Sequence, residues 1–222
     1  MLKLVKGHQL CWDCGTGNGQ VAGYLSDYFD KVYATDISRN QLKEAEKRNN
    51  IIYVKERAEV TSFQNDMFDL ITCAQAVHWL DFVPFYEEVR RTVKNKGLLA
   101  IWGYGLLKIG NSFDDIIHHF YQELIGPYWN EERKHIDSKY ETIAFDFKEI
   151  KLSKQFYIEN DMNLFELEGY FNSWSSVQNY IQSNHENPVN DLITKLKESW
   201  GNTNSTKKVI FPIFTKIGRI KK

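Results

Sequence analysis

The stretch CWDCGTGNGQ, residues 11–20, decides how the rest of the chain is interpreted. A buried strand pattern leads into it and an amphipathic helix pattern follows it, so its three glycines lie in a turn between a strand and a helix. Glycines at such a turn let the backbone approach a ligand closely and direct amide N–H groups at it. The fold therefore depends on this turn and the function depends on which ligand it holds.

Between residues 9 and 102, short apolar segments alternate with segments of helical periodicity. The expected strands are residues 8–13, 31–36, 51–56, 68–74 and 97–104, and the expected helices are residues 21–29, 38–50 and 82–93. Short, nearly continuous apolar strands joined through helices are typical of a parallel sheet that is covered on both faces. Right-handed crossovers make such a sheet doubly wound. The sequence thus predicts an α/β fold with a doubly wound, mostly parallel seven-stranded sheet of the Rossmann-like type.

The strand–helix alternation ends near Gly110, which indicates the domain organisation. We expect residues 1–110 to form a Rossmann-like core. Residues 111–147 and 160–200 are expected to be helical insertions, and residues 148–159 and 206–220 to be closing strands of the same sheet. Open α/β sheets bind ligands at the carboxyl ends of their strands, so we expect the insertions to act there as a lid that binds substrate.

Composition excludes several function classes. The formal net charge of -1 and the absence of a basic stripe argue against nucleic acid or a membrane surface as partner. The start MLKLVKGHQLCW lacks the apolar run of a secretory signal, and only 3 cysteines are present. We therefore expect a cytoplasmic protein that acts on a small molecule, and composition leaves its oligomeric state open.

Cysteine and histidine spacing does not predict a metal or redox site. Cys11 and Cys14 have the spacing of a thiol pair, but a strand places their side chains apart, and no second Cys/His pair lies nearby. His118 and His119 are adjacent, so they point to different sides of a helix. No metal is expected.

The acidic residues around the glycines indicate which nucleotide ligand the turn holds. Gln20 stands where a dinucleotide fingerprint has its last glycine. Asp36 ends the second strand, about 20 residues on, where a carboxylate can accept both ribose hydroxyls. Asp13 in front of the glycines would repel a pyrophosphate, but it helps to orient the turn around a cationic amino-acid ligand. S-adenosylmethionine is such a ligand, and a nicotinamide cofactor is the alternative.

Five segments resemble, in order, the motifs of class I S-adenosylmethionine-dependent methyltransferases. They are WDCGTGNGQ, VYATDIS, RAEVTSF, FDLITCAQAVHWLD and KNKGLLAIWGY. The QAVHW element and the distal NSWSSVQNYI, NPVNDLITKL and VIFPIFTKIGRI are similar to a branch of trans-aconitate methyltransferase-like enzymes, which esterify small acids. The resemblance implies S-adenosyl-L-methionine as cofactor and a methyltransferase fold.

The resemblance also implies site residues. The cofactor-binding set is Asp13, Gly15, Thr16, Gly17, Gln20, Asp36, Ile37, Ala58, Glu59, Ala74 and Gln75. Substrate contacts are expected from Trp79, Trp102, Tyr104 and Arg133. Arg133 would be the carboxylate clamp of an acidic substrate, and the alternative is a solvated surface residue in its mostly charged segment. His78 is the candidate catalytic residue, acting as a base or as a donor that orients the acceptor, and the alternative is a core histidine with a satisfied hydrogen bond.

These roles predict an enzyme that methylates a small molecule, with O-methylation of an organic acid as the reaction. A carboxylate acceptor is ionised at neutral pH, so it needs positioning rather than a general base. A nicotinamide-dependent oxidoreductase remains one alternative. A non-catalytic methyltransferase-like binding module is the other, because fewer residues precede the first strand than this family usually carries.

Overall fold

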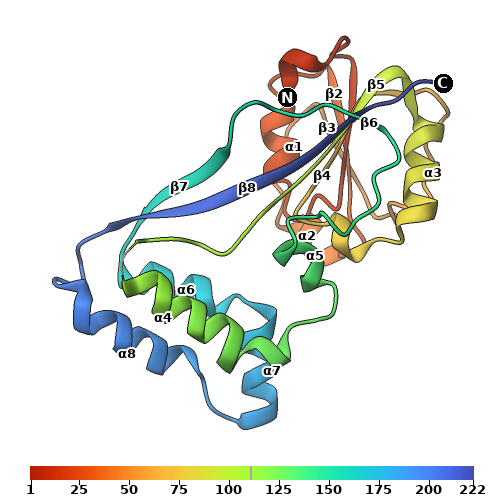
Figure 1. The fold of residues 1–222 in the computed structure, drawn as a ribbon. Coiled ribbons are helices and arrows are strands. Elements are labelled where there is room, and N and C mark those ends of the chain that lie inside the picture. Colours follow the sequence, from red (N-terminus) through yellow and green to blue (C-terminus); the bar gives the residue numbers. More distant parts are fainter. Residues whose placement is uncertain (111) are drawn as a thin grey trace. The chain divides into compact units, whose positions relative to one another are not determined.

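The computed structural model describes residues 1–110 and 112–222, and contacts within the chain separate them into two units (Figure 1). The sheet unit comprises residues 1–104, 135–154 and 214–222. The helical unit comprises residues 105–134 and 155–213. Asn111, expected to open the first insertion, lies outside the described residues.

One path through the sheet contains seven strands. Their order is β3 (Ile51–Val54), β2 (Lys31–Thr35), β1 (Leu10–Cys14), β4 (Phe68–Ala74), β5 (Val93–Tyr104), β8 (Lys207–Arg219) and β6 (Lys148–Glu149). The first five are paired in parallel, and β6 is antiparallel to the end of β8. β7 (Phe156–Met162) pairs antiparallel with the beginning of β8. The predicted Rossmann-like, mostly parallel sheet is confirmed.

Helices cover both faces of the parallel strands. Successive residues of a strand point to opposite faces of the sheet, so neighbouring residues pack against different helices. Leu70 and Leu98 pack in the cluster that contains α1 (Gln20–Leu25). Their neighbours Ile71 and Leu99 pack in the cluster that contains α3 (Phe82–Thr92). The sheet is therefore doubly wound, as predicted.

Three predicted elements are wrong in extent. The expected helix 21–29 ends early, because α1 covers only Gln20–Leu25. The expected strand 148–159 is two strands, β6 and β7, because residues 150–155 follow no regular pairing with β8. The expected helix 38–50 ends early, so α2 covers only Arg39–Lys43. The side chain of Asn50 donates to the carbonyls of Ser26 and Phe29, at 2.7 and 3.1 Å. These bonds hold the segment between α2 and β3 beside the end of α1, so that this segment does not continue the helix.

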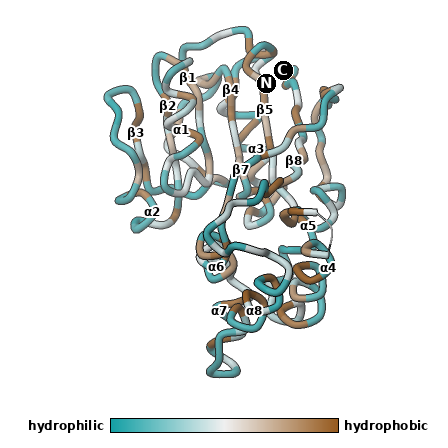
Figure 2. Tube along the Cα trace, turned by 90° about the vertical axis from the view of Figure 1, so that its left-hand side faces the viewer, coloured by the Kyte–Doolittle hydropathy of each residue, from teal (hydrophilic) through white to brown (hydrophobic). Residues whose placement is uncertain are grey.

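The helical unit is built from amphipathic helices around an aromatic core. Its helices are α4 (Ser112–His119), the π-helical turn η3 (Phe120–Leu124), the 3-10 turn η4 (Gly126–Tyr128), α6 (Leu164–Asn172), α7 (Ser175–Asn184) and α8 (Val189–Trp200). Apolar and polar residues alternate along these helices (Figure 2). Phe120 and Phe171 both pack against the ring of Trp174, with centroids 6.4 and 5.0 Å away.

Short helical segments complete the chain. They are η1 (Leu2–Leu4), η2 (Val77–Trp79) and α5 (Arg133–Asp137), which joins the two units in sequence. Among the described residues, the longest helices have about a dozen residues, and none combines the length and apolar character that a membrane span requires.

The carboxylate of Asp69, on β4, fastens the amino ends of three neighbouring strands. One of its oxygens accepts from the backbone N–H groups of Gln9 and Leu10, both at 3.0 Å, where β1 begins. Its other oxygen pairs with Lys94 Nζ at 2.8 Å, where β5 begins. Only 8% of Asp69 is exposed, so these partners replace most of the water around the charge.

We expect Asp69→Ala to lower the free energy of unfolding by about 3 kcal/mol, since hydrogen bonds to a buried charged group contribute about 1.5–3 kcal/mol. The matched control is Asp146→Ala, which removes the same charge from a surface pair with Arg90. That variant should lose less than about 1 kcal/mol. Urea unfolding followed by circular dichroism measures both changes, and equal losses would contradict the role of Asp69.

Candidate active site

The glycine turn after β1 has a backbone that other residues could not adopt easily. Gly15, Gly17 and Gly19 have φ angles of +63°, +57° and +82°. A Cβ atom on Gly15 would lie 2.5 Å from the Cβ of Ala76, and one on Gly19 would meet the hydroxyl of Tyr53. The sequence therefore needs glycine at all three places for conformation, and at Gly15 and Gly19 also for space.

Asp13 holds this turn from inside the sheet. One carboxylate oxygen accepts from the Thr16 hydroxyl at 2.5 Å, and the other accepts from the Thr72 hydroxyl of β4 at 2.7 Å. Burial raises the pKa of Asp13 to about 6, although the hydrogen bonds from both threonines act to lower it. The predicted orienting role of Asp13 thus takes the form of a direct bond to Thr16 inside the turn.

Asp36 joins the glycine turn to the turn that follows β2. Its Oδ2 accepts from the backbone N–H of Gly17, and its Oδ1 accepts from that of Ser38, both at 2.8 Å. Each carboxylate oxygen has a second lone pair, so the group retains acceptor capacity for hydroxyl groups. Ile37, next in the chain, exposes 68% of its surface beside this carboxylate.

Ala58 and Glu59 lie in the loop after β3 and are both buried. Glu59 Oε1 accepts from the backbone N–H of Asp81 at 3.1 Å, and its Oε2 pairs with Arg57 Nε at 3.4 Å. Burial acts to raise the pKa of Glu59, but these hydrogen bonds and the charge of Arg57 lower it below its ordinary value. The carboxylate is therefore ionised and fixes this loop to the segment that begins α3.

Ala74 is the last residue of β4, and Gln75 comes directly after it. The backbone of Gln75 is left-handed, with φ +51°. Its side-chain oxygen accepts from the backbone N–H of Tyr104 at 2.9 Å, and its backbone N–H donates to the carbonyl of Trp102 at 2.8 Å. The side chain of Gln75 thus fastens the carboxyl ends of β4 and β5 together. Trp102 and Tyr104 are half-buried at the end of β5.

His78 lies in the 3-10 turn after β4 and is 5% exposed. Its Nδ1 is 3.1 Å from the hydroxyl of Tyr140, and its ring packs 5.0 Å from that of Trp79. Trp79 itself is 54% exposed. Sequence reasoning missed Tyr140, because the polar-aromatic segment around it has no periodicity that indicates burial.

Two of the predicted site residues, Arg133 and Gln20, lie at the beginnings of helices. Arg133 begins α5 at the end of the helical unit, where its Nε donates to the Tyr121 hydroxyl at 2.6 Å. Its guanidinium lies over Trp129, 4.3 Å from the ring centroid. Gln20 is exposed at the first position of α1. The sheet unit therefore gathers the predicted cofactor residues, and Arg133 belongs to the other unit.

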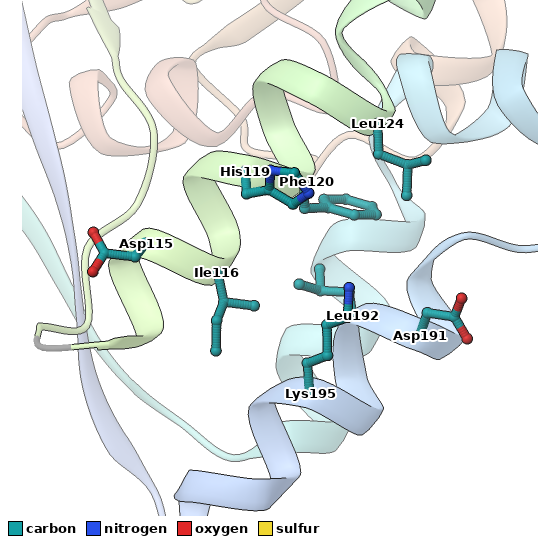
Figure 3. A pocket seen from close by; sticks show the side chains of 8 residues that line it. All are labelled: Asp115, Ile116, His119, Phe120, Leu124, Asp191, Leu192 and Lys195. Carbon is teal, nitrogen blue, oxygen red and sulfur yellow. The ribbon is translucent and has the colours of Figure 1, made fainter.

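The helical unit contains a groove of about 490 Å³ that sequence reasoning did not predict (Figure 3). It lies between α4 and α8 and is lined by Asp115, Ile116, His119, Phe120, Leu124, Asp191, Leu192 and Lys195. None of these was a predicted site residue. Their apolar members are the ordinary inner faces of two amphipathic helices, so the sequence signal for a groove is the same as that for helix packing.

The cysteines are placed as their positions in buried strands lead one to expect. Cys11, Cys14 and Cys73 are all buried and unbridged. Burial raises the pKa values of Cys11 and Cys14 well above the ordinary range, and the thiol of Cys14 lies against that of Cys73 on β4. The thiols of Cys11 and Cys14 are therefore protonated and act as small apolar groups. Within residues 1–110 and 112–222, no three His, Cys, Asp or Glu side chains could together hold a metal ion.

Comparison with known proteins identifies relatives of this site. Residues 12–101 match the family model described as a methyltransferase domain. The chain is 35% identical to a Dictyostelium discoideum protein named as a methyltransferase, over 92% of this chain and 80% of that protein. It is 24% identical to a Saccharomyces cerevisiae protein, CRG1, named as an S-adenosylmethionine-dependent methyltransferase, over 56% of this chain and 47% of that one. A solved structure from Anaeromyxobacter dehalogenans, titled as a type II methyltransferase, has a TM-score of 0.91 and 28% identity, and the match covers 99% of this chain and 93% of that one.

The raised pKa of Asp13 predicts a pH-dependent stability. Its ordinary value is 3.8 and its native value about 6, so the folded protein binds the proton more tightly than the unfolded chain. This group therefore stabilises the fold below pH 4 and loses that contribution as pH rises through 6. Asp13→Asn imitates the protonated form. We expect its free energy of unfolding, relative to the parent protein, to rise by up to about 3 kcal/mol between pH 4 and 7. Urea unfolding at both pH values tests this, and a constant difference would contradict it.

Proposed function

Because the chain belongs to the class I S-adenosylmethionine-dependent methyltransferases, we propose that it methylates an oxygen atom of a small organic acid, as the trans-aconitate methyltransferase-like branch does. The cofactor is S-adenosylmethionine. We propose the organic acid as methyl acceptor and the trans-aconitate methyltransferase-like branch as the place of this chain in the family. The cofactor assignment depends on the carboxylate of Asp36, which is fixed to the glycine turn while keeping acceptor capacity. The proposed acceptor is supported by the buried His78 beside the exposed Trp79 after β4.

The cofactor residues fit an adenosine with a cationic amino-acid end. We assign the two ribose hydroxyls to the remaining lone pairs of Asp36. The exposed side chain of Ile37 packs on the adenine, and Ala58 and Glu59 border its edge. This assignment is supported by Gln20, which stands where a dinucleotide fingerprint has its last glycine, since no phosphate group has to be accommodated.

The amino-acid end of the cofactor is assigned to the turns after β1 and β4. The backbone of Gly15, Thr16 and Gly17 passes beneath it, Gln20 borders it, and Ala74 and Gln75 face it. Asp13 contributes negative charge beneath the turn, and near neutral pH, above its pKa of about 6, that charge favours a cationic ligand. These roles agree with the hydrogen bonds that already hold each of these turns in place.

The acceptor is assigned to aromatic and cationic side chains. S-adenosylmethionine supplies an activated methyl group, so a C–O bond forms as the C–S bond breaks, with no proton to remove from a carboxylate. The chain then has to position the acid and exclude water. We assign Trp79, Trp102 and Tyr104 to the walls and His78 to a hydrogen bond with the acid. Arg133, in insertion residues 111–147, is kept as the proposed carboxylate clamp on its chemistry alone, because a guanidinium group matches a carboxylate in geometry and charge.

The proposal is tested with radiolabelled S-adenosylmethionine and a panel of small di- and tricarboxylic acids. The control compounds are the corresponding primary amides, which keep the shape but lack the ionised oxygen, together with simple phenols and amines. We expect label transfer to the acids alone, recovered as base-labile methyl esters. Transfer to amines or phenols with none to acids would overturn the choice of acceptor.

Arg133→Gln is expected to raise the KM for the acid about tenfold or more, because losing a charge-assisted hydrogen bond costs about 1.5–3 kcal/mol. The dissociation constant of S-adenosylmethionine should stay the same. Steady-state kinetics and calorimetry separate the two effects. An unchanged KM would remove Arg133 from the substrate site.

Gly15→Ala is expected to lower the affinity for S-adenosylmethionine by at least tenfold, because a methyl group there meets Ala76 and the left-handed backbone disfavours alanine. The matched control is Gly169→Ala in α6, where nothing lies within 4 Å of the added methyl group. Calorimetric titration with S-adenosylhomocysteine measures both variants. Equal affinities would contradict the placement of the cofactor at this turn.

A further inference from the structure

The segment that carries Tyr140 has an unusual backbone. Lys139 and Tyr140 are consecutive non-glycine residues with positive φ angles, +51° and +62°. A bulky residue in the left-handed region is a genuine outlier, because its Cβ crowds the backbone. Such a conformation persists only where the surrounding structure holds it, and it commonly occurs at functional sites.

The strained turn brings the Tyr140 side chain into the core beneath His78. The backbone N–H of Tyr140 donates to the His135 carbonyl at 2.7 Å, and its own carbonyl accepts from Ile143 at 3.1 Å. Its ring is 0% exposed and meets that of Phe214 edge-on, with centroids 4.8 Å apart. A phenylalanine would satisfy this packing equally well, so the packing does not explain the hydroxyl.

The hydroxyl of Tyr140 lies 3.1 Å from Nδ1 of His78, across 62 residues of sequence. A phenol carries one proton, and burying its O–H group without an acceptor costs free energy, so a buried tyrosine hydroxyl usually donates to a nearby acceptor. Nδ1 is placed to accept that proton if the imidazole is neutral and carries its own proton on Nε2. The hydrogen bond made by one ring nitrogen sets the protonation of the other.

We infer that Tyr140 is a positioning residue, which donates to Nδ1 of His78 and so holds the neutral tautomer with its proton on Nε2. His78 then offers an N–H donor rather than a lone pair at Nε2. This inference rests on the proposed function in one respect, since a donor suits an anionic oxygen acceptor, whereas a phenol or amine acceptor would need a base.

The test reads the imidazole tautomer directly in the free protein. With ¹⁵N-histidine labelling, two-bond proton–nitrogen correlations identify which ring nitrogen of His78 carries the proton, and His78→Gln assigns the signal. We expect the Nε2-protonated form in the parent protein. We expect Tyr140→Phe to populate the other tautomer or an exchange-averaged mixture.

The matched control is Tyr86→Phe. Tyr86 is 5% exposed in the same hydrophobic cluster, and its hydroxyl has no hydrogen-bond partner among the described residues. Removing that hydroxyl changes the core by the same atom without touching His78. The His78 signals should therefore stay as in the parent protein. A parent protein protonated at Nδ1, or a Tyr140→Phe variant with unchanged tautomer, would overturn the inference.

Kinetics with the acid acceptor provide a second readout. Tyr140→Phe should lower kcat/KM for the acid roughly five- to tenfold, the effect of one hydrogen bond, with the affinity for S-adenosylmethionine unchanged. Tyr86→Phe should leave both constants unchanged. An equal loss in both variants would overturn the positioning role. If no acid is methylated but the tautomer shifts as expected, the choice of acceptor fails and the tautomer assignment stands.

Discussion

The carboxylate of Asp36 joins two turns that belong to different crossovers of the sheet, and the site depends on that junction. Gly17 and Ser38 each donate one backbone N–H to it. Parallel pairing of β1 with β2 brings both turns to the same edge, since Cys14 and Thr35 are opposite each other at the strand ends. The glycine turn is therefore fixed by the protein itself, which reduces the ordering that binding has to supply.

Burying the carboxylate of Asp13 beneath the glycine turn is energetically unfavourable. Burial makes this carboxyl group resist ionisation and raises its pKa to about 6, although the hydroxyl groups of Thr16 and Thr72 donate to it and act to lower the pKa. A neutral residue would be less costly in this position. Under the proposed assignment, a cationic ligand above the turn would offset this desolvation, because opposite charges attract strongly where water is excluded. The amino group and sulfonium of S-adenosylmethionine meet that requirement, whereas a pyrophosphate would add a second unfavourable term.

Most of the fold could be predicted because its signals are local. FDLITCA, residues 68–74, is apolar enough to be a central strand, and residues 82–93 repeat their apolar positions at helical spacing. The errors occur where distant contacts decide the outcome. Helix α2 stops early because the segment after it bonds to the end of α1 through Asn50. The strand expected at 148–159 divides because its two ends pair with different parts of β8.

In the candidate site too, the residues with local sequence signals could be predicted, and those that depend on distant contacts could not. Asp13, the glycines and Asp36 follow directly from the order of strand, turn and helix, so residue types and spacing were enough to single them out. The partner of Asp13 on the next strand, Thr72, depends on the register between β1 and β4. Tyr140 depends on a left-handed turn that no residue preference indicates, because tyrosine is disfavoured there.

The hydrogen bond between Tyr140 and His78 bears on which acceptors the site can serve. A histidine that works as a general base becomes positively charged, and in the serine hydrolase triad a carboxylate at the other ring nitrogen stabilises that charge. At Nδ1 of His78 the structure places a phenol hydroxyl instead. A hydroxyl that donates to Nδ1 stabilises the neutral ring and opposes protonation there. Such a histidine is suited to hold an acceptor that has already lost its proton. A carboxylic acid meets that condition at neutral pH, and most phenols and amines do not.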